Sequence, residues 1–405
     1  MPHLLSARKS GKLWQVKLQQ ELDELHEEGL TRALATTHPV DRFVERDGAK
    51  LVNLAGNDYL ALAQHRRLAQ AAVDAIRRHG VGATASRLIC GHREGHERLE
   101  QRLAVLKKKE AALFFPTGFM ANLAVLGALA RRGDRIYLDK HCHGSLIDAA
   151  AASGATWRRF GHFGYEQLER LLSRARASDV GRRLIVTDGV FSMDGDVADL
   201  PRLCDMADRH GAILVVDDAH GTGVLGAQGL GLAEVQDVEQ RIDVVIGTAS
   251  KAMAGLGGFV AADRVVIETL VNRGRSFIYT TAAPPAQVAV AEAALDVFAD
   301  EPWRRRRLAE MSLRLRDAVD RLGLPTVRSA LPTPIIPIVA GSVAATAALA
   351  QHLEDAGFYA PAIRPPTVAP ATSRVRLALR TDLLDADIES LCAALERWRR
   401  ITHGD

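Results

Sequence analysis

The sequence predicts an α/β fold with a mainly parallel sheet, followed by a smaller α+β unit. Between residues 51 and 285, short apolar runs alternate with stretches of helical length, and polar or glycine-containing turns follow the runs. Parallel strands need long crossover connections, so this alternation is typical of strands joined by helices. After Pro284-Pro285, long helical stretches lead to strand-like runs at residues 334–339 and 374–379, which indicate a separate C-terminal unit.

The elements follow in order along the chain. Leucines at helical spacing among charged residues predict an amphipathic helix over residues 13–34, at the surface or in an interface. We predict an N-terminal helical segment over residues 1–50, a large α/β domain over 51–285 and a small α+β domain over 286–405. Buried strands are expected at Arg135–Asp139, Leu184–Thr187, Ala212–Val216 and Asp243–Gly247.

Composition limits the class of protein. The chain has 405 residues, of which 47% are hydrophobic and 25% charged, enough to bury a large core. A net charge of +3 is too weak to predict nucleic-acid binding. No run approaches the roughly 20 apolar residues of a membrane span, and the N-terminus lacks a signal-peptide core, so we expect a cytoplasmic protein. The cysteines lie far apart without metal-ligand spacing, which predicts reduced thiols and no metal: Cys90, Cys142, Cys204 and Cys392.

The first candidate site residues follow the predicted strand over residues 212–216. Asp217 and Asp218 come directly after it, and His220 and two glycines follow. A carboxylate at the end of a buried strand is costly unless it meets a cation. A protonated ring nitrogen of a cofactor would be such a cation, whereas a helix N-cap or a metal ligand are the alternative interpretations.

A lysine stands at the corresponding end of the strand over residues 243–247. Thr248 and Ser250 precede Lys251, and small residues follow it. Hydroxyl groups at a strand end suit phosphate, and a semi-buried lysine beside a cationic group acts as a nucleophilic amine. A lone loop lysine is otherwise solvated, so this interpretation depends on the neighbouring Asp217 segment.

Three further segments carry weaker signals. Residues 184–196 resemble a calcium loop but lack its final glutamate, so we interpret them as a turn with one useful hydroxyl, that of Ser192. Residues 114–122 predict a turn opening a helix, whose free N–H groups suit a phosphate. His141 and His143 follow the strand over residues 135–139, where a histidine can stack on a planar ring or remain solvated.

Together these segments resemble the α-oxoamine synthases, a family of fold-type I pyridoxal-phosphate enzymes. The resemblance rests on Asp217 with His220, on Thr248 with Lys251, and on the Phe-Ser-Met-Asp-Gly-Asp segment at residues 191–196, and it runs from about residue 14 to 395. It implies a fold-type I pyridoxal-phosphate-dependent transferase with a mainly parallel seven-stranded sheet. It also implies a homodimer with its sites at the subunit interface.

The resemblance assigns roles residue by residue. It implies that Lys251 forms the Schiff base with pyridoxal 5'-phosphate, that Asp217 binds the pyridine nitrogen and that His143 stacks on the ring, where it also meets substrate. It places His220 and Ser192 beside the phenolic oxygen. It assigns the phosphate region to Gly118, Phe119 and Thr248, with Thr280 and Thr281 reaching the phosphate of a neighbouring subunit. It assigns the amino-acid carboxylate to Arg376 and the substrate path to Arg32, Arg364 and Thr367.

The C-terminal segment bears on the substrate. Residues 362–368, with their Arg-Pro-Pro-Thr run, resemble the family member that condenses L-alanine with a pimeloyl thioester of coenzyme A or acyl carrier protein in biotin biosynthesis. A sister synthase using glycine or serine, or a non-catalytic dimeric binding protein, are the alternatives. Ala371 replaces a glycine that is usual in the family. The basic runs at residues 107–109 and 304–307 are either contacts for a partner's phosphates or solvated helix faces.

Overall fold

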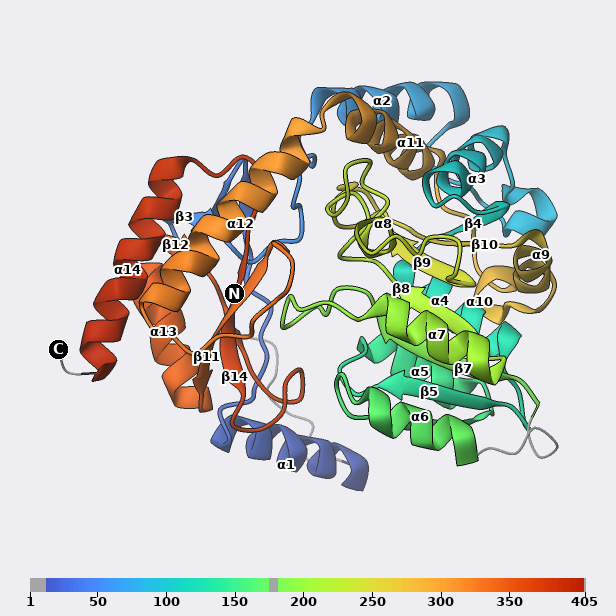
Figure 1. Cartoon of the computed structure of the whole chain (residues 1–405). Coiled ribbons are helices and arrows are strands. Elements are labelled where there is room, and N and C mark those ends of the chain that lie inside the picture. The colour runs from blue at the N-terminus through green and yellow to red at the C-terminus, as the bar shows by residue number, and fades with distance from the viewer. Residues whose placement is uncertain (1–11, 175–180, 404–405) are drawn as a thin grey trace.

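Seven strands form the central sheet of the computed structural model, which describes residues 12–174 and 181–403 (Figure 1). Their order is β4-β10-β9-β8-β7-β5-β6, and β10 alone runs antiparallel to its neighbours. The predicted mainly parallel seven-stranded sheet is confirmed. The strands are β4 (Ala111–Phe115), β5 (Arg135–Asp139), β6 (Thr156–Phe160), β7 (Arg183–Asp188), β8 (Ile213–Asp217), β9 (Val244–Thr248) and β10 (Gly258–Ala262).

Helices cover both faces of this sheet, which is why its strands are continuous apolar runs. Successive residues of β8 point into different cores, since Val215 packs with α4, α5 and α9 while Leu214 and Val216 pack with α3 and α7. The helices of this part are α2 (Arg66–His79), η1 (Arg87–Gly91), α3 (Glu94–Leu106), α4 (Gly118–Leu129), α5 (Gly144–Ala152), α6 (Tyr165–Arg174), α7 (Leu200–His210), α8 (Leu232–Val235), α9 (Arg264–Arg273), α10 (Arg275–Ile278) and α11 (Pro285–Asp300).

Two small sheets lie on the other side of the molecule (Figure 1). β14 pairs with β11 and β13, and β12 pairs with β3 to extend an N-terminal hairpin. The N-terminal strands therefore join the C-terminal part of the chain, and the domain ranges remain a prediction. These elements are β1 (His38–Val40), β2 (Phe43–Arg46), β3 (Ala49–Asn53), α12 (Trp303–Arg321), β11 (Ile335–Gly341), α13 (Val343–Asp355), β12 (Phe358–Tyr359), β13 (Ala362–Ile363), β14 (Ser373–Ala378) and α14 (Asp385–His403).

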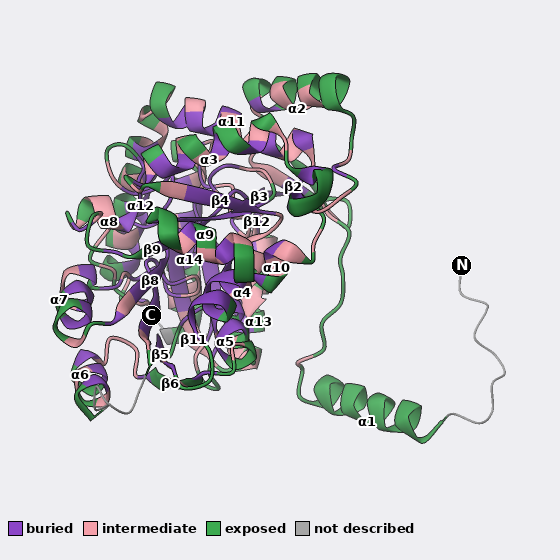
Figure 2. Cartoon of the chain, turned by 90° about the vertical axis from the view of Figure 1, so that its right-hand side faces the viewer, coloured by how far each residue is buried: buried purple, intermediate pink, exposed green. Residues whose placement is uncertain are grey.

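The first helix, α1 (Leu13–Glu27), stands away from the body of the chain and all of its residues are exposed (Figure 2). It is shorter than the predicted helix over residues 13–34, because Gly29 takes a positive φ of 67°. The N–H of Leu30 then reaches the carbonyl of Leu25 at 2.7 Å, which closes the helix end. No helix in the described ranges combines the length and apolar character that crossing a bilayer requires.

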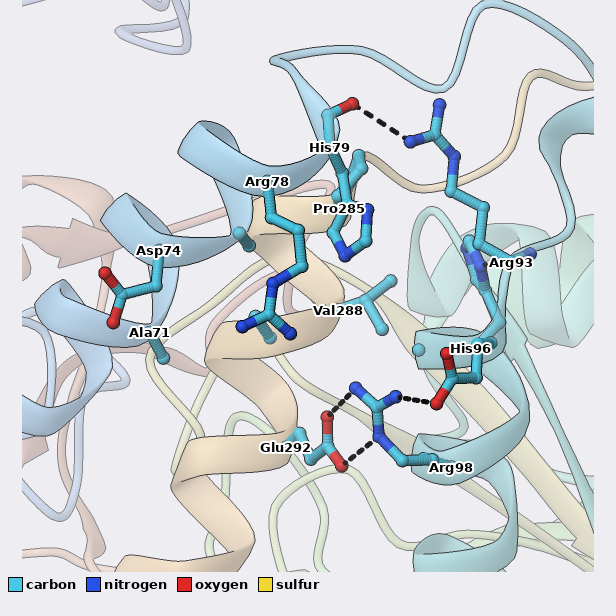
Figure 3. Close-up of a pocket in the computed structure, with 14 residues that line it drawn as sticks. Ala71, Asp74, Arg78, His79, Arg93, His96, Arg98, Pro285, Val288 and Glu292 are labelled. Carbon is cyan, nitrogen blue, oxygen red and sulfur yellow. Dashed lines mark hydrogen bonds and ion pairs between the residues drawn. The ribbon is translucent and has the colours of Figure 1, made fainter.

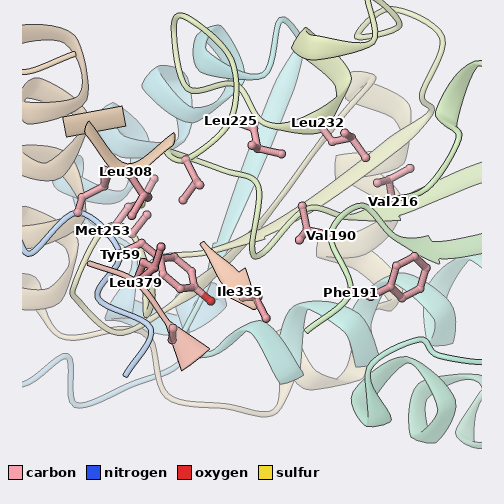
Figure 4. Close-up of a cluster of buried hydrophobic side chains, with 14 of the residues drawn as sticks. Tyr59, Val190, Phe191, Val216, Leu225, Leu232, Met253, Leu308, Ile335 and Leu379 are labelled. Atoms are coloured by element: carbon pink, nitrogen blue, oxygen red, sulfur yellow. The ribbon is translucent and has the colours of Figure 1, made fainter. Parts of the chain in front are cut away.

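One hydrophobic cluster joins the two sides of the molecule (Figure 4). Tyr59, Ile335 and Leu379 contribute from the small sheets and the segments beside them, while Val216 contributes from the large sheet and Val190 from the segment after β7. Burial of this shared apolar surface holds the carboxyl ends of β7 and β8 beside β14, the strand that carries Arg376.

Gly195 gives a test of this junction, because it has φ +69° and a Cβ there would overlap the carbonyl oxygen and Cβ of Ile335. We expect Gly195→Ala to lower the free energy of unfolding by roughly 2–4 kcal/mol, from backbone strain and overpacking together. Gly211→Ala is the control, since Gly211 has φ +57° but no atom within 4 Å, and it should cost about 1 kcal/mol. Urea unfolding measures the free energy of unfolding of both variants. Equal decreases would show that packing at the junction is loose.

Candidate active site

The candidate site is built at the carboxyl ends of neighbouring strands, where ligands bind in open α/β sheets. Asp217 ends β8, and its paired neighbour Asp188 ends β7. Asp217 Oδ2 accepts a hydrogen bond from Asn122 Nδ2 at 3.0 Å, and Oδ1 accepts from the N–H of Ala219 at 3.0 Å. Both oxygens are thereby oriented on a carboxylate that is only 7% exposed.

Asp188 lies beside Asp217 without adding a second charge. Burial and the nearby Asp217 raise the pKa of Asp188 well above its ordinary value, so its carboxyl group stays protonated. The N–H of His143 donates to Asp188 Oδ1 at 3.2 Å. Asp188 therefore fixes the turn that carries His143 and leaves Asp217 as the charged member of the pair.

Lys251 follows β9, the strand next to β8. Burial lowers the pKa of Lys251 to about 8, although the carboxylate of Asp217, next in importance, raises it. Among the residues that the structure describes, the Lys251 ammonium makes no hydrogen bond. A lysine with this pKa is partly deprotonated near neutral pH, and an amine without a fixed partner is suited to attack a carbonyl group.

His220 is buried and neutral. Burial, followed by the charge of Lys251, lowers the pKa of His220 well below its ordinary value. Its Nδ1 lies 2.7 Å from the hydroxyl of Tyr59, which donates its own proton to Asn57 Oδ1 at 3.0 Å. Nδ1 therefore donates to Tyr59, and Nε2 remains an acceptor.

Arg376 belongs to the same network. Its guanidinium donates to the carbonyl of Ser192 at 2.6 Å, to Asn57 Oδ1 at 3.0 Å and to the hydroxyl of Tyr59 at 3.1 Å. The segment 191–196 was predicted to contribute the hydroxyl of Ser192, but the contact that the structure gives this residue runs through its backbone carbonyl. Arg376 is thus a buried cation held in one orientation close to Lys251.

His143 caps the start of α5 and is linked to Asp217 through two polar side chains. Its Nδ1 lies 2.7 Å from the hydroxyl of Ser145, and Asn122 donates to both that hydroxyl, at 2.7 Å, and Asp217. His143 as a residue is exposed, so a ligand can reach it. The position expected for a stacking histidine is therefore beside Asp217.

A cradle for an anion lies where α4 begins. Gly118 and Phe119 occupy its first turn, where helix N–H groups have no partner within the helix. Thr248 is adjacent, since a Cβ on Gly118 would lie 3.5 Å from its hydroxyl oxygen, and that oxygen lies 2.8 Å from Ser250 Oγ. A Cβ on Gly258 would lie only 2.5 Å from Gly118 Cα, so glycine is required for β10 to approach this turn.

The predicted threonines lie beside this cradle. The hydroxyl of Thr280 points to the sulfur of Met120 at 3.9 Å, one residue after Phe119, and Thr281 is exposed. Their contact with the phosphate of a second subunit remains a prediction.

Arg32, Arg364 and Thr367 form a separate cluster. Arg32 lies 3.4 Å from the hydroxyl of Thr367, and Arg364 donates to the carbonyls of Gly29 and Thr31, the latter at 2.5 Å. In the described part of the chain, no hydrogen bond joins this cluster to Lys251, Asp217 or His220. Its predicted place on the substrate path remains a prediction.

Ala371 shows why the family usually has glycine at this position. Ala371 takes φ +61°, a conformation that costs a non-glycine residue roughly 1–2 kcal/mol. The chain accepts this strain in the loop between Thr367 and β14.

Several residues of the basic runs are engaged within the chain. Lys107 is buried and donates to Asp218 Oδ2 at 2.8 Å, and Lys108 pairs with Glu239. Arg305 is buried against two backbone carbonyls, and Arg307 donates to the carbonyl of Leu383. The hypothesis that these runs bind a partner's phosphates is wrong for the residues that are buried, because internal acceptors already use their donors.

A cavity of about 240 Å³ lies away from these strand ends, between α2, α3 and α11 (Figure 3). Two of its arginines are engaged within the chain, since Arg98 pairs with Glu94 and Glu292, and Arg93 donates to the carbonyl of His79 at 3.0 Å. We assign no function to this cavity. The described residues also contain no group of three or more histidine, cysteine or acidic side chains placed to hold a metal.

Comparisons with known proteins agree with this geometry. The sequence matches the aminotransferase class I and II family over residues 49–395. The 8-amino-7-oxononanoate synthase of Geobacter sulfurreducens is 44% identical over 380 residues, covering 93% of this chain and 96% of that protein. The structure of Sphingomonas wittichii serine palmitoyltransferase is 30% identical with a TM-score of 0.90, covering 97% of this chain and 99% of that one.

The chain therefore belongs to the aminotransferase class I and II family of pyridoxal-phosphate enzymes. Within it, the chain is an α-oxoamine synthase, an acyltransferase resembling 8-amino-7-oxononanoate synthase. A serine palmitoyltransferase that is 27% identical, with a TM-score of 0.89 over 97% of this chain and 100% of its own, was solved with the cofactor.

The residues present fit pyridoxal phosphate. Lys251 supplies an unpaired amine, Asp217 an oriented carboxylate and the first turn of α4 unpaired N–H groups. Sequence reasoning gave no role to Asn122 or Tyr59, which orient Asp217 and Arg376. Neither lies in a glycine-rich or charged motif, and their role depends on contacts with residues 95 and 317 positions away.

The lowered pKa of Lys251 can be tested on protein freed of cofactor. The rate at which an acylating reagent labels Lys251, followed by mass spectrometry, should rise with pH around a midpoint near 8. Asp217→Asn should move the midpoint lower, because it removes the largest charge that favours the ammonium. A midpoint near the ordinary lysine value, or one that Asp217→Asn leaves in place, would contradict the assignment.

Proposed function

We propose that the protein condenses L-alanine with a pimeloyl thioester of coenzyme A or acyl carrier protein and releases carbon dioxide and the free thiol of the carrier to give 8-amino-7-oxononanoate, a step of biotin biosynthesis. The observation that carries this proposal is 44% identity to an 8-amino-7-oxononanoate synthase over 93% of the chain. The arrangement of Lys251, Asp217 and Arg376 supports it, since it supplies the three groups that the reaction needs.

The cofactor, when bound, supplies an electron sink for the negative charge left at the α-carbon. Asp217, held by Asn122 and Ala219, keeps a proton on the ring nitrogen, because a buried carboxylate stabilises a cation beside it. His143 covers the ring face. Gly118, Phe119 and Thr248 would bind the phosphate, and Thr280 and Thr281 would reach the phosphate of the neighbouring subunit.

The substrate groups are assigned by charge and position. Arg376 binds the carboxylate of L-alanine through Nη1, because its Nε and Nη2 already donate to Ser192, Asn57 and Tyr59 and so fix its orientation. Lys251, as a free amine, would accept the α-proton at Nζ. The neutral Nε2 of His220 accepts a hydrogen bond at the phenolic edge of the ring. Arg32, Arg364 and Thr367 bind the acyl substrate.

A sister synthase is the second candidate, favoured by the likeness to serine palmitoyltransferase. That enzyme is only 30% identical to this chain, against 44% for the Geobacter relative. The two candidate functions therefore differ in the amino acid and the acyl thioester that the enzyme prefers, and measuring these preferences decides between them.

The purified protein, incubated with pyridoxal phosphate, L-alanine and pimeloyl-coenzyme A, should form 8-amino-7-oxononanoate, measured by mass spectrometry. Glycine and L-serine, and palmitoyl-coenzyme A in place of the pimeloyl thioester, should react at least 10-fold more slowly. Lys251→Ala should form no product, because it removes the general base. Faster reaction of serine with palmitoyl-coenzyme A would favour the sister synthase instead.

We also propose that the active form is a homodimer. Large apolar side chains are exposed around the start of α4, among them Phe119 at 45%, Tyr279 at 73% and Ile89 at 80%. These residues belong to one face, since α10 contacts both α4 and η1. An exposed apolar face of this kind is typical of a subunit interface. The exposed helix α1 offers a second apolar surface to the partner.

Ile89→Asp should convert the dimer to monomers, because a charge at the centre of an apolar interface is left without a partner. Sedimentation velocity at several protein concentrations measures the change. Leu313→Asp is the matched control, since Leu313 is 57% exposed on α12, outside this face, and it should leave the mass unchanged. A wild-type protein that sediments as a monomer would disprove the proposal.

A further inference from the structure

His162 bridges two buried carboxylates in the turn after β6. Its Nδ1 lies 2.9 Å from Asp139 Oδ1, and its Nε2 lies 2.9 Å from Asp196 Oδ2. Asp139 and Asp196 are only 1% and 4% exposed. An imidazole that donates from both nitrogens carries a positive charge, and two acidic partners favour that form.

The surroundings of His162 are closed and charged. Its ring stacks on His141 with centroids 4.1 Å apart at 17°, and it meets the edge of Phe191 at 4.5 Å. Burial alone would lower the pKa of His162, but hydrogen bonds to Asp139 and Asp196 raise it to about 9. Four other titratable groups surround His162 and its partners. Asp194 pairs with both His141 and Arg374. Arg316 lies near Asp196, and Tyr165 lies near Asp139.

Each of the two acidic residues shapes a loop of the candidate active site, Asp139 through its carboxylate and Asp196 through its backbone carbonyl. Asp139 accepts from the N–H of His141 at 2.8 Å and from that of Phe163 at 3.2 Å, so it shapes the turn that leads to His143. The carbonyl of Asp196 accepts from the N–H of Phe191 at 3.0 Å, which closes the loop 191–196.

The loop 191–196 in turn holds strand β14. Its Ser192 carbonyl accepts from Arg376, and its Asp194 pairs with Arg374, two residues earlier on the same strand. The position of Arg376 relative to the large sheet therefore depends on the shape of this loop.

We propose that protonated His162 is a positioning residue, which ties Asp139 to Asp196 and so holds the loop 191–196 in the shape that aims Arg376 at the carboxylate of the amino-acid substrate. This inference rests on the proposed role of Arg376. It assigns no contact between His162 and substrate or cofactor.

His162→Gln tests the inference, because glutamine keeps hydrogen-bonding capacity but cannot carry the charge. The KM for L-alanine should rise about tenfold, as expected for loss of a charge-assisted hydrogen bond that fixes the loop, while the KM for the acyl thioester stays within twofold. His210→Gln is the matched control, since His210 also pairs with an acid, Glu169, at 2.7 Å, but on α7 away from the site. An unchanged KM for alanine in His162→Gln would overturn the proposal.

The pH dependence gives a readout that mere loss of folding would not move. The pKa of His162 is raised in the folded protein, so its stabilising charge is complete at neutral pH and is lost as pH rises through about 9. The amino group of alanine titrates in assays of both proteins and raises both KM values. Between pH 8 and 10 the KM of the wild type for alanine should therefore rise more steeply than that of His162→Gln. Parallel curves would overturn the proposal.

A rescue variant covers the possibility that His162→Gln fails to fold. His162→Gln with Asp196→Asn removes one of the uncompensated carboxylates and should recover most of the affinity for alanine. Arg376→Lys tests the proposed carboxylate site apart from the role of His162, because it should raise the KM for alanine without involving His162. If Arg376→Lys has no effect, the proposed carboxylate site fails; if only the His162 variants have none, the positioning role fails.

Discussion

The active site depends on the attraction between one buried carboxylate, Asp217, and the amine of Lys251 on the neighbouring strand. β8 and β9 run parallel and end side by side, so the two groups meet at the same edge of the sheet. Burial lowers the pKa of Lys251 to about 8, and Asp217 opposes that shift. The balance leaves an amine that is reactive near neutral pH and a carboxylate able to stabilise a cation between the two strands.

Several residues around this pair are either paired or uncharged. Asp188 is neutral, Asp218 pairs with buried Lys107, and His220 is neutral beside Tyr59. An unpaired charge at any of these positions would cost several kcal/mol and would disturb the field at Lys251. His162 compensates charge farther from Lys251, since its cation lies between two carboxylates and links the loops before His143 and around Ser192.

The sequence was sufficient to predict the parts of the structure that depend on local pattern. Each of the four predicted strands agrees with the structure to within a residue or two, because apolar runs at strand length are a strong signal. The pairing of Asp217 with Lys251 followed from strand ends and from the family resemblance. The roles of Lys107, Asn122 and Tyr59 could not be predicted, since each depends on a partner more than 20 residues away, and the helix end at Gly29 depended on a turn that periodicity does not report.

The most direct test is a crystal structure of the protein with pyridoxal phosphate. The account predicts continuous electron density from Lys251 Nζ to the cofactor, with the ring nitrogen within hydrogen-bonding distance of Asp217 and the phosphate at the start of α4. Cofactor bound elsewhere, or a ring whose nitrogen faces a group other than Asp217, would contradict it.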